Sequence, residues 1–101
     1  PSAPPPGLND FLNQVRTMIE SHQNYPFAAR RRNLEGEVLL QIAINANGNL
    51  SQVEISRSSG YQLLDQAAQK AVRAAAPFPA PTGFRLGDVR FAIPITFNII
   101  R

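Results

Sequence analysis

The sequence predicts one small α+β domain, with a three-stranded antiparallel or mixed sheet in the order 2-1-3 and two helices. In this prediction a ββαβ core is preceded by an N-terminal helix. Apolar residues recur at helical spacing over 8–21 and 63–75, and they alternate, as in strands with one buried face, over 38–44 and 89–99. The 101 residues are 44% hydrophobic and 17% charged, a balance typical of a single folded core.

The first seven residues contain four prolines, which favour the polyproline II conformation and cannot build a core. We therefore predict the end of a proline-rich linker over residues 1–7 and the folded domain over residues 8–101. A simple domain-boundary tail is the alternative. The apolar runs are far shorter than the roughly 20 residues that span a bilayer, so any membrane anchor is expected upstream.

The first helix is predicted from an apolar stripe with polar residues between its members. This stripe consists of Leu8, Phe11, Leu12, Val15, Met18 and Ile19. We expect a cap near Asn9. The helix should end near His22–Asn24, because the residue before Pro26 is disfavoured in helical geometry. A basic run, Arg30–Arg32, follows.

A β-hairpin is predicted next. The buried face of its first strand contains alternate residues: Val38, Leu40, Ile42 and Ile44. Residues 45–49 are rich in asparagine and include Gly48, so they tolerate positive φ and favour a turn. The second strand passes through Leu50, Val53 and Ile55.

A second helix follows, with Ser58 and Ser59 as expected capping residues. Its apolar face consists of Leu63, Leu64, Ala67, Ala68, Ala71, Val72 and Ala75, and prolines after this face end it. The last strand is predicted over Val89–Ile99. Pro94 cannot donate to a ladder, which favours a position at the sheet edge. If the first strand lies in the middle, the outer strands are parallel and the exposed last strand is available to a peptide.

The residues of enzymes and cofactor sites do not gather in any recognisable pattern. There is no cysteine, His22 is the only histidine, and the carboxylates and glycines are scattered. We therefore predict no catalytic residue, metal site or cofactor, and no enzyme. The formal charge of +3 and the run Arg30–Arg32 are too limited to favour nucleic acid, and most phenylalanines lie at core positions. The run is interpreted as a charged connector, with contact to an anionic surface or partner as the alternative.

Several motifs, in order and at their spacing, resemble the C-terminal periplasmic domain of the TonB family. They cover about three-quarters of the chain. The motifs are Tyr25-Pro26 with the basic run, Leu34-Glu35-Gly36-Glu37-Val38, Asn47-Gly48-Asn49-Leu50, Arg57-Ser58-Ser59-Gly60, Leu63-Leu64-Asp65-Gln66-Ala67-Ala68, Ala75-Ala76-Pro77-Phe78-Pro79 and Ile93-Pro94-Ile95-Thr96-Phe97.

The resemblance implies a periplasmic binding module, anchored to the inner membrane in the full-length protein and working with ExbB and ExbD. Such a domain captures the TonB box, a short segment of outer-membrane transporters for siderophores, haem or cobalamin, by strand addition to its last strand. It couples the proton-motive force to uptake. The alternatives are a TolA-like envelope module, for which cysteines would be expected, and a structural dimerisation module; the family's short fragments also imply a possible homodimer.

The resemblance also implies two partner-binding segments. One precedes the Tyr-Pro motif and the other is the last strand, where Arg90, Ala92, Thr96 and Asn98 point outward. The expected contact residues are His22, Gln23, Asn24, Tyr25, Val89, Arg90, Phe91, Ala92, Ile93, Ile95, Thr96 and Phe97. His22 stands where some family members have a glutamine, and Pro94 would leave a gap in a peptide ladder if its nitrogen faced outward.

Overall fold

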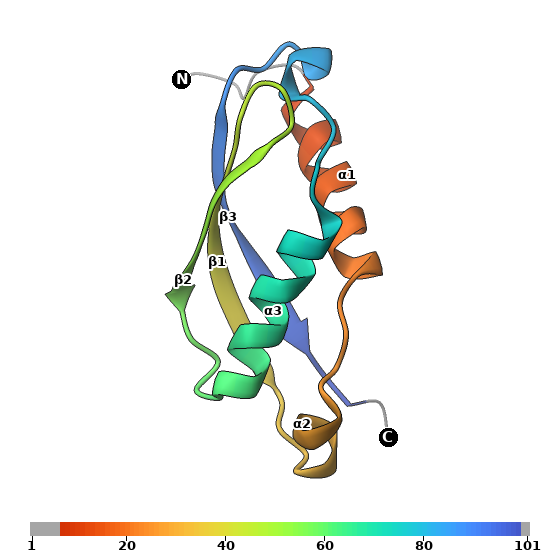
Figure 1. Cartoon of the computed structure of the whole chain (residues 1–101), viewed down its shortest axis with the longest axis vertical. Coiled ribbons are helices and arrows are strands. Elements are labelled where there is room, and N and C mark those ends of the chain that lie inside the picture. Colours follow the sequence, from red (N-terminus) through yellow and green to blue (C-terminus); the bar gives the residue numbers. More distant parts are fainter. Residues whose placement is uncertain (1–6, 100–101) are drawn as a thin grey trace.

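The computed structural model describes residues 7–99, which form an elongated body of 44 × 30 × 23 Å (Figure 1). Its elements are α1 (Leu8–Ser21), α2 (Phe27–Arg31), β1 (Gly36–Ile44), β2 (Leu50–Arg57), α3 (Gln62–Ala75), the 3₁₀ helix η1 (Pro81–Phe84) and β3 (Val89–Phe97). Apart from Gly7, the linker predicted over residues 1–7 lies outside the described residues, and that prediction stays open. None of the helices within 7–99 combines the length and apolar character that a membrane span requires.

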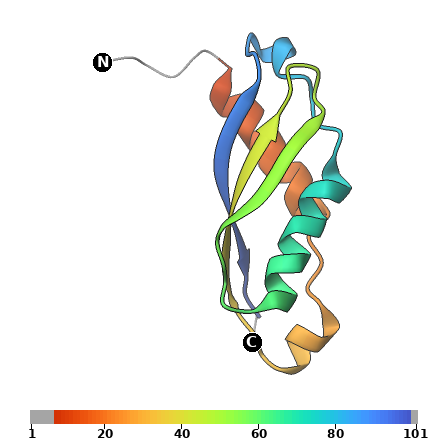
Figure 2. The ribbon, with the colours of Figure 1, turned by 60° about the vertical axis from the view of Figure 1, so that its left-hand side comes forward.

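The sheet order β2-β1-β3 confirms the predicted topology. β1 is antiparallel to both neighbours, so the two outer strands are parallel to each other. Helices α1 and α3 lie on one face of the sheet, which Figure 2 shows from the side. The fold thus has two layers, and the crossover through α3 places β3 at one edge.

The core lies between the helices and the inner face of the sheet. The alternation predicted for the strands is observed, since Val38, Leu40, Ile42 and Ile44 are all at most 1% exposed. From the helices come Phe11, Val15, Ile19, Leu64, Ala68 and Val72, each with no exposed surface. The small alanine side chains of α3 allow that helix to pack closely on the sheet.

The start of α1 differs from the prediction. The helix begins at Leu8, and its cap is Gly7, at φ 88°, rather than Asn9. A Cβ atom on Gly7 would lie 2.6 Å from the carbonyl oxygen of Phe84. The chain enters the helix so close to η1, and at such a positive φ, that glycine is the residue that fits.

The start of α3 also differs. Tyr61 precedes the helix without a side-chain cap, so Ser58 and Ser59 do not cap it as predicted. Both serine hydroxyls donate instead to the carboxylate of Asp65, and Ser59 adds its backbone N–H at 2.9 Å. Burial of Asp65, which is 9% exposed, would raise its pKa, but these hydrogen bonds outweigh burial and hold the pKa below its ordinary value. The serines therefore tie the loop after β2 to the first turn of α3.

Two further differences concern segment ends. The run Arg30–Arg32, interpreted as a charged connector, lies partly in a short helix, α2, which begins after Pro26 and ends at Arg31. β3 ends at Phe97 rather than Ile99, because Phe97 pairs with Gly36, the first residue of β1. Without a partner strand beyond that point, the ladder stops.

The turn between β1 and β2 requires its glycine. Gly48 has φ 95°, and a Cβ atom there would lie 2.3 Å from the carbonyl oxygen of Phe78. The Gly48 carbonyl accepts a hydrogen bond from the Phe78 N–H at 3.0 Å, and Asp88 accepts one from Ala46 N–H at 2.8 Å. The hairpin is thus fastened to the segments that lead from α3 into β3.

Candidate partner-binding edge

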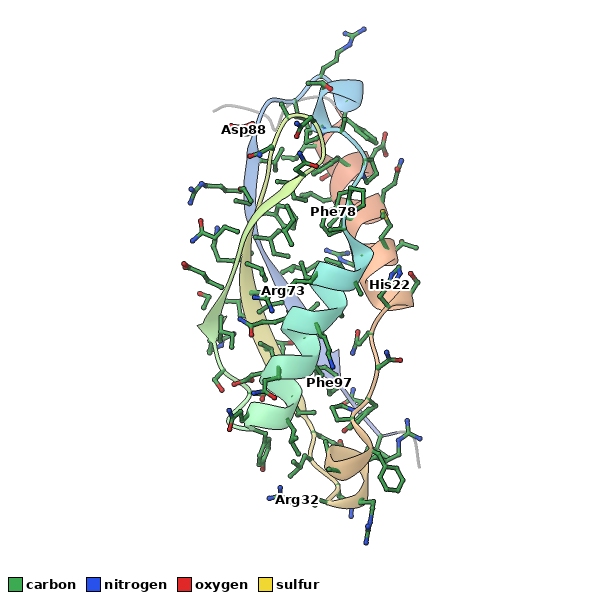
Figure 3. The ribbon with its side chains drawn as sticks, in the orientation of Figure 1. His22, Arg32, Arg73, Phe78, Asp88 and Phe97 are labelled. Carbon is green, nitrogen blue, oxygen red and sulfur yellow. The ribbon has the colours of Figure 1, made fainter. Side chains whose placement is uncertain are left out.

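β3 is the candidate site, because one of its two sides has no strand partner among residues 7–99. All nine of its residues pair with β1, from Val89 opposite Ile44 to Phe97 opposite Gly36. Figure 3 places Asp88, just before the strand, and Phe97, at its end, far apart along the long axis. The open side therefore extends over the full strand, and the predicted edge position is confirmed.

The backbone groups on the open side can be assigned from one contact. The carbonyl oxygen of Thr96 accepts a hydrogen bond of 2.8 Å from Nε2 of Gln23, a residue that lies outside β1. Successive strand residues direct their N–H and C=O groups to opposite sides. Arg90, Ala92, Pro94 and Thr96 therefore present these groups to the open side. The absence of an N–H on Pro94 agrees, since a proline facing β1 would break the central ladder.

The open side is consequently uneven. Arg90 and Ala92 each offer both a donor and an acceptor, whereas Pro94 offers only its carbonyl. At Thr96 the carbonyl is already engaged by Gln23. A partner strand would find the most complete pairing in the first half of β3.

The side chains divide in the same way. Arg90, Ala92, Pro94 and Thr96 are exposed, and the Thr96 hydroxyl lies 3.4 Å from a carboxylate oxygen of Glu37 on β1. The other predicted contact residues of the strand have inward side chains: Val89, Ile93, Ile95 and Phe97 are buried and Phe91 is partly buried. Their role in binding remains a prediction. The backbone groups that face the open side belong to the residues between them, Arg90, Ala92, Pro94 and Thr96.

The connector between α1 and α2, residues 22–26, runs along the far end of β3. Gln23 reaches Thr96, and the ring of Tyr25 packs edge-on against Phe97 with centroids 5.5 Å apart. The Tyr25 hydroxyl donates to the carbonyl of Leu34, which fixes the ring. Two of the four predicted connector residues are thus held at the strand.

The other two predicted connector residues, His22 and Asn24, face α3. Together with Pro26 they line one wall of an open groove of about 830 Å³, whose other wall is the surface of α3 from Leu63 to Ala74. The exposed His22 ring is held by its Nδ1 atom, 2.9 Å from the carbonyl oxygen of Met18. The predicted binding residues therefore form two surfaces, one along β3 with Gln23 and Tyr25 and one at the α3 groove with His22 and Asn24.

One exposed residue was absent from the predicted site. Phe27, 75% exposed, opens α2 directly after the connector. The available signal was its position outside every apolar stripe, next to Pro26 and the arginine run. Within residues 7–99 no three His, Asp or Glu side chains come together as a metal site.

The sequence of the domain matches a known family. Residues 21–99 match the family described as Gram-negative bacterial TonB protein C-terminal. Protein TonB of Helicobacter pylori strain J99 is 36% identical over 96 residues, which are 93% of this chain and 33% of that protein. The chain thus spans about a third of the length of the full-length relatives that it matches first.

Solved structures show the same fold. The NMR solution structure of Helicobacter pylori TonB-CTD superposes with a TM-score of 0.81 at 35% identity, over 92% of this chain and 84% of that one. The structure of TolAIII bound to a peptide derived from the N-terminus of TolB has a TM-score of 0.69, over 99% of this chain and 82% of that one. At 18% identity this second likeness concerns the fold alone. With the match over residues 21–99 and the relatives at 36% identity, this chain belongs to the family of TonB C-terminal domains.

Proposed function

We propose that this domain works in the periplasm and captures the TonB box of outer-membrane transporters by adding it as a strand to β3. The observation that carries the proposal is the open side of β3, which has no strand partner among residues 7–99 and presents the backbone groups of Arg90 and Ala92. An extended peptide gains affinity there from main-chain hydrogen bonds, which demand little of its sequence. Each bond contributes about 0.5–1.5 kcal/mol net.

The uneven edge sets the register of the captured peptide. The full donor and acceptor pairs at Arg90 and Ala92 should hold its central residues. Toward Thr96 the peptide meets an engaged carbonyl, and its next residues come against Gln23 and Tyr25. This arrangement supports contact with both predicted segments, the last strand and the connector.

In the whole protein the domain would deliver mechanical energy. On this proposal an upstream segment anchors it in the inner membrane, where ExbB and ExbD use the proton-motive force to drive it. Pulling on the captured box would then open a transporter for a siderophore, haem or cobalamin. The family membership supports this role, and the chemistry of the edge requires no cofactor.

The same open side favours one competing function, pairing between two copies of β3 in a homodimer. A TolA-like envelope module is a further alternative, supported only by the shared fold. The gap at Pro94 favours a short peptide over a second copy, because two antiparallel copies of β3 would double the number of missing donors.

Amide hydrogen exchange with an added TonB-box peptide tests the proposal. The N–H groups of Arg90 and Ala92 should exchange freely in the free domain and become protected on binding. Those of Phe91 and Ile93 should be protected throughout, because they face β1. Two peptides supply the control, each N-methylated at every second residue and offset from the other by one residue. Only the peptide whose methylated nitrogens would face β3 should fail to bind.

Two results would count against strand capture. Equal protection changes at Arg90 and Phe91 would contradict the assigned open side. Protection of Arg90 that depends on domain concentration rather than on peptide, together with a doubled mass in sedimentation, would favour the homodimer.

A further inference from the structure

The end of the molecule formed by α2 combines exposed aromatic rings with clustered positive charge. Among residues 7–99 the exposed large hydrophobic side chains are Phe27 (75%), Tyr61 (41%) and Ile55 (39%). Two of these three lie at this end, where Phe27 opens α2 and Tyr61 shares a shallow depression with Arg32. Arg30, Arg31 and Arg32 are all exposed beside them. We call Phe27, Arg30–Arg32 and Tyr61 the α2 tip.

Two arginines of the α2 tip lie against aromatic rings, one within the tip and one in the adjoining connector. The guanidinium of Arg31 is 5.8 Å from the centroid of the Phe27 ring, and that of Arg30 is 5.4 Å from the Tyr25 ring. Residues 27–35 contain three arginines and one glutamate, which gives a formal charge of +2. Asp65, in the first turn of α3, keeps its negative charge, but its carboxylate is buried and hydrogen-bonded to two serines. The α2 tip therefore presents apolar rings within a positive field.

The position of the α2 tip gives it a direction. It lies with α2 at one end of the long axis, and the start of α1 lies near the other end (Figure 1). Arg32 lies at the extremity in Figure 3. A projecting end meets a flat surface more readily than it follows a strand of nucleic acid, which binds along a groove. In a periplasmic protein held from its N-terminal side, this end points away from the anchor.

We propose that the α2 tip binds the surface of an anionic phospholipid bilayer. Arginine guanidinium groups pair with phosphate through two hydrogen bonds, and aromatic rings favour the boundary between headgroups and acyl chains. Phe27 and Tyr61 enter that boundary, while Arg30, Arg31 and Arg32 bind the headgroups. The α2 tip shares no residue with the open side of β3, so vesicle binding and peptide capture can be measured separately, and the proposal rests only on the proposed periplasmic location.

Tryptophan fluorescence tests the proposal directly, because the chain has no tryptophan. Phe27→Trp should show a blue-shifted, strengthened emission with vesicles containing phosphatidylglycerol and phosphatidylcholine, and little change with phosphatidylcholine alone. Ile55→Trp, on β2, is the matched reporter away from the α2 tip and should not respond. Each arginine near an anionic surface strengthens binding about fivefold, so high salt should weaken the response strongly.

Charge-matched triple variants locate the contact. Arg30→Gln/Arg31→Gln/Arg32→Gln should lower sedimentation with anionic vesicles at least about tenfold. Arg16→Gln/Arg73→Gln/Arg85→Gln removes the same net charge elsewhere and should retain most binding; circular dichroism confirms that both remain folded. Equal losses in the two triples, or equal responses of the Phe27→Trp and Ile55→Trp variants, would overturn the proposal, as would the absence of vesicle binding by the unsubstituted domain.

Discussion

The side-chain amide of Gln23 donates a 2.8 Å hydrogen bond to the backbone carbonyl of Thr96, 73 residues away in the sequence. This contact joins the connector to the open side of β3. It occupies one of the acceptors that a captured strand would use. On the proposed strand capture, Gln23 and a partner peptide would compete for Thr96.

Gln23→Ala should strengthen binding of a TonB-box peptide by about two- to tenfold. In this variant the peptide can pair with the Thr96 carbonyl without first breaking the hydrogen bond from Gln23, which is worth about 0.5–1.5 kcal/mol. Isothermal titration calorimetry measures the change, and Gln14→Ala, at an exposed position of α1, is the control. Weaker binding by Gln23→Ala would mean that the glutamine contacts the peptide rather than competing with it.

Proline substitution should separate the two sides of β3. Ala92→Pro removes a donor from the open side, so peptide affinity should fall about tenfold while the stability of the domain changes little. Ile93→Pro removes a donor that faces β1 and should destabilise the domain by about 3 kcal/mol. Peptide titration and urea unfolding of the two variants give the comparison. Loss of stability in both alike would refute the assigned alternation.

Pro94→Ala supplies the reverse change. The alanine N–H restores a donor to the open side, so the peptide should bind a few-fold more tightly. Amide exchange should show the new N–H protected only when the peptide is present. Sedimentation of this variant is equally informative, because a completed edge should also favour self-association, which Pro94 disfavours in the unsubstituted domain.

Asp65→Asn should destabilise the domain by about 1–3 kcal/mol near neutral pH, since the charged acceptor of three hydrogen bonds is lost. The pKa of Asp65 is lowered from 3.8 by folding, so the ionised carboxylate stabilises the folded state at pH above 3.8. That contribution is lost as pH falls through the lower folded pKa. Urea unfolding from pH 7 to 2 should show the variant and the unsubstituted domain converging at the acid end. Glu54→Gln, at an exposed position of β2, is the control and should change the free energy of unfolding little at neutral pH.

Gly48→Ala should cost about 2 kcal/mol or more, because the side chain is placed at positive φ and against the carbonyl of Phe78. Thermal unfolding should register a fall in Tm of roughly 8 °C or more, at about 4–8 °C per kcal/mol for a domain of this size. Gly87→Ala is the matched control, since a Cβ atom there meets nothing within 4 Å. A similar loss in both variants would show that chain flexibility, rather than the close approach, decides the effect.

The fold was predictable where the chain alternates or recurs strongly. The alternating apolar residues of β1 and β3 identify the buried face of the sheet, and the apolar stripe of α1 identifies the buried face of that helix. Pro94 indicates that β3 lies at a sheet edge. The caps were not predictable, because Ser58 and Ser59 favour any nearby partner, and Asp65 becomes that partner only once α3 folds. The local sequence shows which residue types can cap a helix, whereas the tertiary structure decides which hydrogen-bond acceptor lies nearest to each of them.

The alternation of the last strand correctly predicted that Arg90, Ala92 and Thr96 point outward. It did not predict which backbone groups of β3 remain unpaired, because that depends on the register with β1. The contact between Gln23 and Thr96 could not be predicted from the sequence, because it joins segments that are adjacent only in space. Phe27 was missed because a helix of five residues has no periodicity to detect.

The closeness of Gly7 to Phe84 has a mechanical consequence. The chain enters the domain beside η1, the segment that precedes β3, so a pull on Gly7 directed along the long axis would reach the sheet at the Val89 end of the strand. A peptide paired with β3 and leaving past Thr96 would then be loaded in shear. In shear all the inter-strand hydrogen bonds carry the load at the same time, whereas a pull perpendicular to the strands would break them one after another. A set of individually weak hydrogen bonds that is loaded in this way can hold under tension and still dissociate quickly once the tension ends.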